Sequence, residues 1–289
     1  MNNYLKPGSD LGRELSKLQL IERSIIKKFR EQLWNPFIRG VKRYEQIQPM
    51  DKIAVCISGG KDSMLMAKLM QQLQRHSNIT FELAFQVMDP GYSPENLNKV
   101  VDCAEELGIP VTVFSSNIFD TVSSITKGSP CYLCARMRRG NLYKYAQDMG
   151  CNKIALGHHM NDVIETTVMG MFYGAQLQAM LPKLHSTNFA GMQLIRPMYN
   201  IRERDIRAWR DYNKLEFIAC ACRFTENCDI EDEDAGGSKR KEIKRLIKQL
   251  AQTNPGVENN IFQSIHNAHL DTLPGYKAKG VEHSFLEMF

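Results

Sequence analysis

The sequence lacks long hydrophobic segments, internal repeats and low-complexity tracts. No stretch approaches the roughly 20 apolar residues that span a bilayer, and the N-terminal MNNYLKPGSDLGREL has no apolar core of the signal-peptide kind. These absences argue against membrane, secreted and repeat proteins, and they make the cytoplasm the expected location. A chain of 289 residues with 43% hydrophobic and 24% charged residues is instead typical of a globular protein.

A strong excess of one charge is also missing. The net charge of +5 permits a polyanionic partner such as RNA without requiring one. In a reducing cytoplasm, the eight cysteines are expected to be metal ligands, reactive thiols or core residues rather than disulfides. We expect Cys56, Cys103 and Cys151 to pack in the core, since they lie within or at the ends of predicted elements.

Strands and helices alternate through the middle of the chain. The predicted strands are 52–57, 79–88, 111–115, 153–156 and 192–195. The predicted helices are 63–75, 94–107, 134–149, 161–172, 203–212 and 239–250. This alternation predicts an α/β fold with a doubly wound parallel sheet and helices on both faces.

Three parts are expected along the chain. Residues 1–50 form an N-terminal helical extension in which apolar residues recur at helical spacing over 10–47, punctuated by Pro36 and Pro49. Residues 51–228 form the sheet domain. Residues 229–289 contain an acidic loop, DIEDEDAGG, followed by a C-terminal helical extension.

A glycine-rich turn follows the first predicted strand, and it reads Ser58-Gly59-Gly60-Lys61-Asp62-Ser63. Glycines let a backbone approach a phosphate closely, and a helix that starts at the turn adds the positive end of its dipole. A lysine charge and serine hydroxyls complete a set of groups suited to phosphate. The spacing fits neither the Walker A loop nor the GxGxxG fingerprint.

This turn resembles the PP-loop of the N-type ATP pyrophosphatases, which have a HUP-like α/β fold and cleave ATP between its α and β phosphates. The resemblance implies that all six residues, from Ser58 to Ser63, hold the pyrophosphate part of ATP. Lys61 would neutralise charge in the transition state. Asp62 is a candidate Mg²⁺ ligand, or a residue that simply favours the helix N-terminus.

The pair Cys131 and Cys134 has CxxC spacing and precedes an Arg-rich helix. By itself this pair is compatible with a zinc half-site, a redox pair or an iron–sulfur half-site. The later cysteines, Cys220, Cys222 and Cys228, contain no second CxxC. Arg136, Arg138 and Arg139 are candidates for RNA phosphate contact, or for an ordinary solvated helix face.

Four segments together resemble the tRNA 2-thiocytidine synthetase family of sulfurtransferases: CYLCARMRRGNLY, KIALGHHMNDVIETTVMGMFYG, IRPMYNIRERDI and FIAC. The resemblance runs from about residue 17 to about 270. It implies a [4Fe–4S] cluster held by Cys131, Cys134 and Cys220, with one iron open for the transferred sulfur. The family has a second CxxC where this chain has Cys220-Ala221-Cys222, so Cys222 is the alternative third ligand or a sulfur-carrying thiol.

The resemblance also places the loop GHHMND beside ATP. Gly157 would allow close approach, Asp162 would contact Mg²⁺ or a ribose, and His158 would contact ATP or act as an ordinary loop or capping residue. Val87 and Met88, at the end of the second predicted strand, are candidates for adenine contact or for core positions.

The expected activity is ATP-dependent thiolation of a tRNA pyrimidine, which the resemblance makes a cytidine of the anticodon loop. The implied cofactors are ATP, Mg²⁺ and the cluster. The implied partners are tRNA, a sulfur donor such as free sulfide or a cysteine desulfurase, and a second copy of the chain. Two other functions remain open: a PP-loop enzyme that adenylates a small molecule or carrier protein, and a non-enzymatic iron–sulfur or zinc protein that binds RNA or senses redox state.

Overall fold

A mostly parallel sheet lies at the centre of the protein. We describe it from a computed structural model, over residues 15–116, 118, 130–218 and 239–288, with the backbone alone at 130–135 and 288. The strand order is β3-β2-β1-β4-β6-β5. The bounds are β1 (Lys52–Ile57), β2 (Glu82–Asp89), β3 (Val111–Ser115), β4 (Lys153–Ala155), β5 (Lys183–His185) and β6 (Gln193–Ile195). All pairings are parallel except that of the edge strand β5 with β6.

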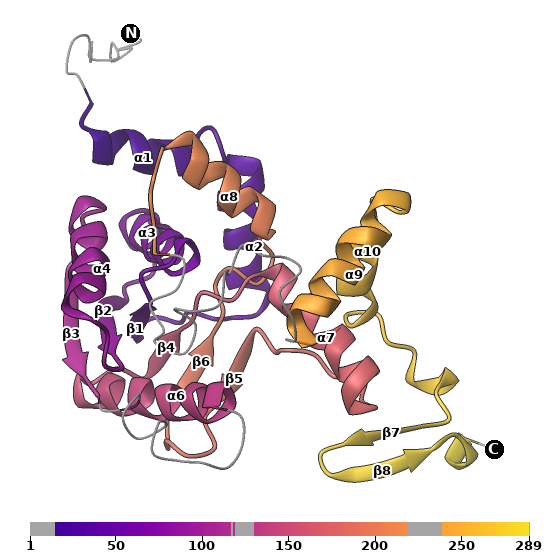
Figure 1. Cartoon of the computed structure of the whole chain (residues 1–289). Coiled ribbons are helices and arrows are strands. Elements are labelled where there is room, and N and C mark those ends of the chain that lie inside the picture. The colour runs from indigo at the N-terminus through magenta and orange to yellow at the C-terminus, as the bar shows by residue number, and fades with distance from the viewer. Residues whose placement is uncertain (1–14, 117, 119–129, 219–238, 289) are drawn as a thin grey trace, which may run out of the picture. The chain divides into compact units, whose positions relative to one another are not determined.

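The side chains of the central strand β1 are buried on both faces of the sheet. Alternate side chains of a strand point to opposite faces, and here Ile53, Val55 and Ile57 join one hydrophobic cluster while Ala54 and Cys56 join another. The first cluster includes α3 (Lys61–His76) and α4 (Pro94–Glu106), and the second includes α6 (Pro130–Asp148). Helices therefore cover both faces (Figure 1), which confirms the predicted doubly wound α/β fold.

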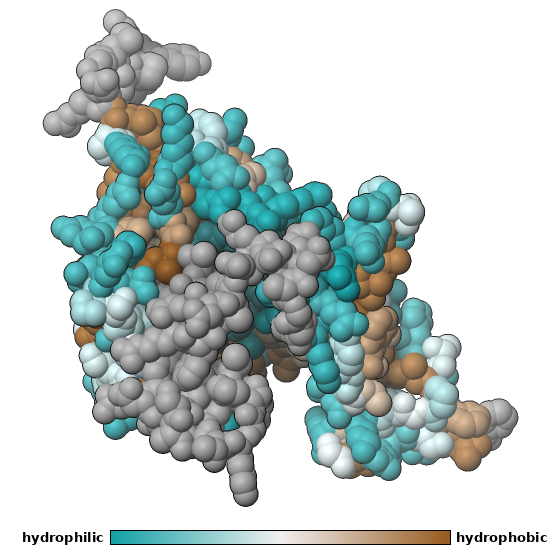
Figure 2. Space-filling model, viewed as in Figure 1, coloured by the Kyte–Doolittle hydropathy of each residue, from teal (hydrophilic) through white to brown (hydrophobic). Residues whose placement is uncertain are grey.

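The N-terminal helices add a further layer on the α3 side. They are α1 (Lys17–Ile26), a π-helix (Arg30–Trp34) and α2 (Asn35–Arg43), and α8 (Glu203–Tyr212) packs beside them. Glu22 of α1 accepts hydrogen bonds from Lys68 and Arg75 of α3, each at 2.7 Å. Trp209 of α8 donates to the Ser24 hydroxyl at 3.1 Å. Figure 2 shows mainly hydrophilic residues over α8, as expected for a helix that buries only Ile206 and Trp209.

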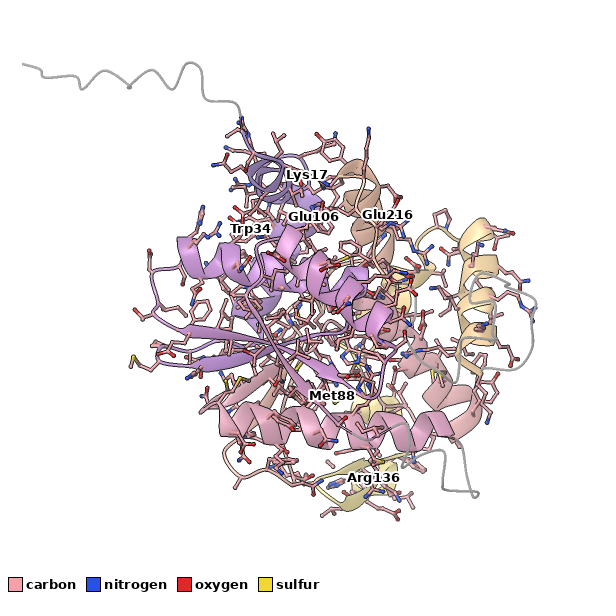
Figure 3. All side chains as sticks on the ribbon, turned by 60° about the vertical axis from the view of Figure 1, so that its left-hand side comes forward. Lys17, Trp34, Met88, Glu106, Arg136 and Glu216 are labelled. Atoms are coloured by element: carbon pink, nitrogen blue, oxygen red, sulfur yellow. The ribbon has the colours of Figure 1, made fainter. Side chains whose placement is uncertain are left out.

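Lys17 and Glu106 join α1 to the end of α4, and Figure 3 shows the two side chains together. These N-terminal contacts attach the predicted helical extension to the sheet. The extension is not one continuous helix, because a turn at residues 27–29 separates α1 from the π-helix, which leads directly into α2 with Pro36 in its first turn.

The chain divides into two compact units. The first contains residues 1–157 and 182–226, and the second contains 158–181 and 227–289. In the second unit α7 (Met160–Gly174) packs against α9 (Lys239–Thr253) and α10 (Val257–Ser264). A hairpin of β7 (Gly275–Ala278) and β8 (Val281–Ser284) lies between 3-10 turns at Leu270–Thr272 and Phe285–Met288. The predicted boundaries near residues 50 and 228 remain a prediction about domains.

Several elements differ from the sequence prediction. Helix α6 begins at Pro130 rather than at 134, so Cys131 lies within the helix and not in a loop. Proline is favoured in the first turn of a helix, where its missing N–H costs nothing. Helix α3 begins at Lys61 rather than at 63. The acidic loop lies outside the described residues, and no helix among those described is long and apolar enough to cross a bilayer.

Candidate functional site

The strand order creates a switch point beside β1. The chain continues from β1 to β2 and β3 on one side of the sheet, whereas β4 and β6 lie on the other side. Ligands of doubly wound sheets bind at the carboxyl ends of the two strands that flank such a point. Here those strands are β1, which leads into the glycine turn, and β4, which leads to Gly157. The sheet therefore brings together two segments that are far apart in the sequence.

The backbones of these two segments touch. A Cβ added at Gly157 would lie 3.2 Å from the Ser63 nitrogen and 3.3 Å from the Asp62 carbonyl carbon. Both contacts are with backbone atoms, which cannot rotate away as a flexible side chain could. A side chain at position 157 would therefore push the backbone at the start of α3 by a few tenths of an ångström, and glycine allows the loop after β4 to approach it this closely.

The turn itself has a conformation that needs glycine. Gly59 has φ +83°, and a Cβ there would lie 2.7 Å from Cγ2 of Val100. Gly60 is the N-cap of α3, and no side chain at this position makes a cap hydrogen bond to the helix start. The same arrangement provides the positive end of the helix dipole, which suits a phosphate.

The two serines brace the turn. The Ser58 backbone N–H and hydroxyl both lie 3.1 Å from the Ser63 hydroxyl oxygen. The Ser63 hydroxyl in turn donates to the Gly60 carbonyl at 2.9 Å. These hydrogen bonds close the turn on itself and hold its backbone in one conformation.

The lysine of the turn lies between two carboxylates. Its Nζ is 3.0 Å from Oδ2 of Asp62 and 3.3 Å from Oε1 of Glu203, the first residue of α8. Arg207, one helical turn later, also contacts Glu203 at 2.9 Å. Glu203 lies in the segment IRPMYNIRERDI, but the sequence alone predicts no role for it. An acidic residue at a helix start is ordinarily explained by the helix dipole, so its type and position alone could not reveal this contact.

The candidate adenine residues are buried. Val87 is fully buried in the α3-side cluster, and Met88 packs with Tyr92, Phe114 and Ile118 near the end of β2 (Figure 3). They therefore occupy core positions, and contact with adenine stays a prediction.

His158 and Asp162 belong to the second unit. Asp162 accepts a hydrogen bond from the His159 backbone N–H at 2.9 Å, which caps the start of α7. Arg240 of α9 lies 3.6 Å from Asp162 and 2.9 Å from Glu165. Burial raises the pKa of Glu165 more than the neighbouring Arg240 lowers it. Asp162 thus contacts the His159 backbone and the Arg240 side chain, and its contact with Mg²⁺ or ribose remains a proposal.

The cysteines fall into two groups. Cys56 and Cys151 are buried and Cys103 is half-buried, and all three are free thiols in apolar surroundings, which confirms the predicted packing role. Burial raises the pKa of Cys56 to about 12, so it stays protonated at neutral pH. The backbones of Cys131 and Cys134 lie in the first two turns of α6, whereas Cys220, Cys222 and Cys228 are outside the described residues.

The three arginines that follow the CxxC lie on α6. Arg136 and Arg139 are exposed, and Figure 3 labels Arg136 on this helix. Arg138 is half-buried and donates to the Tyr92 hydroxyl at 3.1 Å. Arg138 therefore helps to attach α6 near the end of β2, while Arg136 and Arg139 are available to an outside partner.

The fold and the turn define an α/β protein of the PP-loop class, and residues 28–222 match the family described as PP-loop domain. The tRNA-cytidine(32) 2-sulfurtransferase of Alcanivorax borkumensis is 33% identical over 252 residues, which cover 85% of this chain and 84% of that protein. The protein of the same name from Shewanella amazonensis is 35% identical over 260 residues, with 88% and 76% covered. The chain belongs to the tRNA-cytidine(32) 2-sulfurtransferase family, as its sequence motifs predict.

A solved structure shares the fold. The U34-tRNA thiolase NcsA from Methanococcus maripaludis, solved with its [4Fe-4S] cluster, matches with a TM-score of 0.64. The match covers 85% of this chain and 80% of that one at 20% sequence identity. At this identity the likeness supports the α/β architecture.

Proposed function

We propose that this protein is an ATP-dependent tRNA sulfurtransferase that converts a cytidine of the anticodon loop, at position 32, into 2-thiocytidine. One observation carries the proposal: the glycine turn with Lys61 lies at the switch point of the sheet, and the backbone at Gly157 packs against it. The chain that contains this turn belongs to the family described above. The relatives that match most of the chain carry the name of this activity.

The chemistry has two steps. The O2 oxygen of the cytosine attacks the α-phosphorus of ATP, so an O–P bond forms and pyrophosphate leaves. Sulfide then attacks C2, the C–O bond breaks and AMP leaves, with a proton released to water. Neither step changes the oxidation state of carbon or sulfur, so no external oxidant or reductant is needed.

The turn would bind the pyrophosphate portion of ATP. Backbone N–H groups at the start of α3 would be donors for phosphate oxygens, and the hydroxyls of Ser58 and Ser63, which donate within the turn, would hold its backbone in place around the phosphates. Lys61 would neutralise the charge that builds on the leaving pyrophosphate. Asp62 would hold Mg²⁺, which would supply positive charge to the phosphates.

The cysteine set is chemically suited to a [4Fe–4S] cluster. Cys131 and Cys134 are three residues apart in a helix, a spacing that places two residues on one side of it, and a helix start favours anionic groups such as thiolates. We propose Cys131, Cys134 and Cys220 as the ligands, with Cys222 as the alternative third thiolate or a sulfur-carrying thiol. When bound, the cluster supplies an open iron that carries the sulfur.

Arg136 and Arg139 are the proposed contacts for the tRNA backbone. Both are exposed on the helix that carries the CxxC, so phosphate binding there would orient the RNA near the sulfur. A base in a loop leaves its stack at low cost, which suits an anticodon-loop target. We further propose that free sulfide or a cysteine desulfurase donates the sulfur, and that the enzyme acts in the cytoplasm as a homodimer.

Nucleoside mass spectrometry tests the proposal. Anaerobically reconstituted protein is incubated with unmodified tRNA, Mg-ATP and sulfide, and the digested tRNA is analysed. We expect 2-thiocytidine with the natural protein, and none with Lys61→Ala or with Cys131→Ala. A thiolated base other than cytidine would correct the substrate, and the absence of any thiolated base would overturn the proposal.

A further inference from the structure

Glu203 has surroundings that its position in the sequence does not explain. Only 12% of its side chain is exposed, whereas the side chain of the next residue, Arg204, is 70% exposed. A carboxylate at the first position of a helix gains from the dipole while remaining in water, so burial is not needed for capping. The Glu203 carboxylate instead points to Lys61 of the glycine turn, with 3.3 Å between Oε1 and Nζ.

Burial of this carboxylate is tolerated because cations neutralise it. A buried carboxylate is costly unless it is paired. Lys61 approaches Glu203 from α3 and Arg207 approaches it from the same helix, at 3.3 and 2.9 Å. The contact with Lys61 joins two helix starts, because Lys61 is the first residue of α3 and Glu203 is the first residue of α8.

The same contact restricts the lysine. A lysine side chain has four rotatable bonds, and its ammonium can occupy many positions in water. Here the ammonium is held between Asp62 and Glu203, and the Lys61 side chain is 19% exposed. A charge that is already in place needs no reorganisation when negative charge develops during the reaction.

We propose that Glu203 is a positioning residue for Lys61, keeping its ammonium at the phosphate turn so that it is in place when the polyphosphate binds. This inference rests on the proposed function, in which ATP is the substrate of that turn. Glu203 acts through Lys61 and does not touch the reacting atoms.

If Glu203 positions Lys61, its replacement should lower kcat without weakening Mg-ATP binding. Glu203→Gln keeps the size of the side chain but removes its charge, so Asp62 is the carboxylate that still holds Lys61 and the ammonium is less restricted. We expect kcat for thiolation, at saturating Mg-ATP and tRNA, to fall about tenfold, because a transition-state interaction is lost. The dissociation constant for Mg-ATP should not rise, since a negative charge near the phosphates has been removed.

Arg207→Gln should affect ATP affinity in the opposite direction. Arg207 is half-exposed, so its replacement leaves the buried structure intact, but it removes one of the cations that neutralise Glu203. The site becomes more negative, and we expect the dissociation constant for Mg-ATP to rise about threefold. Asp211→Asn is the matched control, because Asp211 is an exposed carboxylate of the same helix paired with Arg210 at 2.7 Å. It should change neither quantity.

Calorimetric titration of each protein with Mg-ATP, without tRNA, gives the dissociation constants, and thiolation assays give kcat. A Glu203→Gln variant with unchanged kcat would overturn the inference. It would also be overturned if Glu203→Gln and Arg207→Gln both weakened ATP binding, as expected from simple damage to the fold. Failure of the natural protein to thiolate tRNA would overturn the proposed function instead, while the two ATP affinities would still test the role of Glu203.

Discussion

At the scale of single residues, close backbone contacts define the candidate site. Gly59 and Gly157 both occupy positions where a Cβ would meet another atom within 3.3 Å. At Gly59 that atom belongs to the side chain of Val100, but at Gly157 it belongs to the backbone of the phosphate turn. The two glycines therefore have different consequences when they are replaced.

Gly157→Ala should weaken ATP binding while the protein remains folded. The added methyl group would displace the backbone at Asp62 and Ser63, and such overpacking costs about 1–3 kcal/mol. Since the displaced atoms belong to the phosphate turn, we expect the dissociation constant for Mg-ATP to rise at least about tenfold. Calorimetric titration measures this constant.

Gly140→Ala is the control for that change. A Cβ at Gly140, in helix α6, would meet nothing within 4 Å, so alanine should stabilise the protein by about 1 kcal/mol in urea unfolding. ATP affinity should be unchanged. If Gly157→Ala bound Mg-ATP as tightly as the natural protein, the close approach of the two loops would have no bearing on nucleotide binding.

At the scale of elements, a buried ion pair attaches α1 to α3. Lys68 is fully buried and contacts Glu22 at 2.7 Å, and it also donates to the Gln71 side chain and the Leu107 carbonyl. Burial by itself would raise the pKa of Glu22, but hydrogen bonds and charge from Lys68 and Arg75 outweigh it and lower the pKa below 4.5. The carboxylate form of Glu22 is therefore the one that holds the helix.

Glu22→Gln should destabilise the protein by about 3 kcal/mol at neutral pH, because it leaves the buried Lys68 ammonium without a counter-charge. The folded pKa of Glu22 is lowered, so its stabilising effect is complete above the unfolded value of 4.5 and is lost as the pH falls through the folded value. Urea unfolding from pH 3 to 7 should show a smaller acid-dependent loss of stability in the variant than in the natural protein, since other paired carboxylates such as Asp51 remain in both.

Glu106→Gln is the matched control, since Glu106 of α4 forms an ion pair with Lys17 at the start of α1. That carboxylate is 46% exposed, so its loss should cost less than about 1 kcal/mol. Equal losses for the two variants would mean that the burial of Lys68 does not determine the strength of the α1 attachment.

The sequence predicts the bounds of some helices and strands but not of others. The bounds of β1, β3 and α8 agree with the prediction, because buried strands and an amphipathic helix have clear patterns. The three-residue strand β5 and the hairpin β7–β8 are too short and too polar for such patterns, and α10 was also missed.

Within the site, residue type and spacing identified the glycine turn and Gly157 as segments of interest. The contact of Lys61 with Glu203 could not be predicted, because it depends on how α8 packs beside α3. The boundary of α6 was misplaced because Pro130 was taken to belong to a loop rather than to a first helical turn.

At the scale of the whole molecule, the two units differ in how much they bury. The first unit contains all three hydrophobic clusters found among the described residues. Figure 2 shows brown surface along the C-terminal helices of the second unit. The large apolar side chains exposed on this unit lie on and after α7, on α9, on β8 and in the two 3-10 turns: Met171, Phe172, Leu177, Leu181, Leu250, Leu270, Val281, Phe285 and Leu286. Regions with few buried contacts open more readily than the rest of a protein.

Amide hydrogen exchange should therefore distinguish the units. We expect the amides of β7–β8 to exchange roughly 100-fold faster than those of β1, because a two-stranded hairpin without buried residues is only marginally stable. The edge strand β3 is the control, since it is of similar length but belongs to the six-stranded sheet and buries Phe114. Hairpin protection equal to that of β1 would mean that another surface covers it in solution.

The division into two units also has a consequence for synthesis on the ribosome. Helix α7 leaves the ribosome between β4 and β5 of the first unit, but the helices that pack against it, α9 and α10, are made only after residue 238. Helix α7 buries Val163, Ile164 and Val168 in the folded protein, and the helices it packs against are synthesised later than α7 itself. The nascent protein can complete its sheet while α7 still lacks these partner helices, and this helix is where a chaperone would be needed until residues 239–264 emerge.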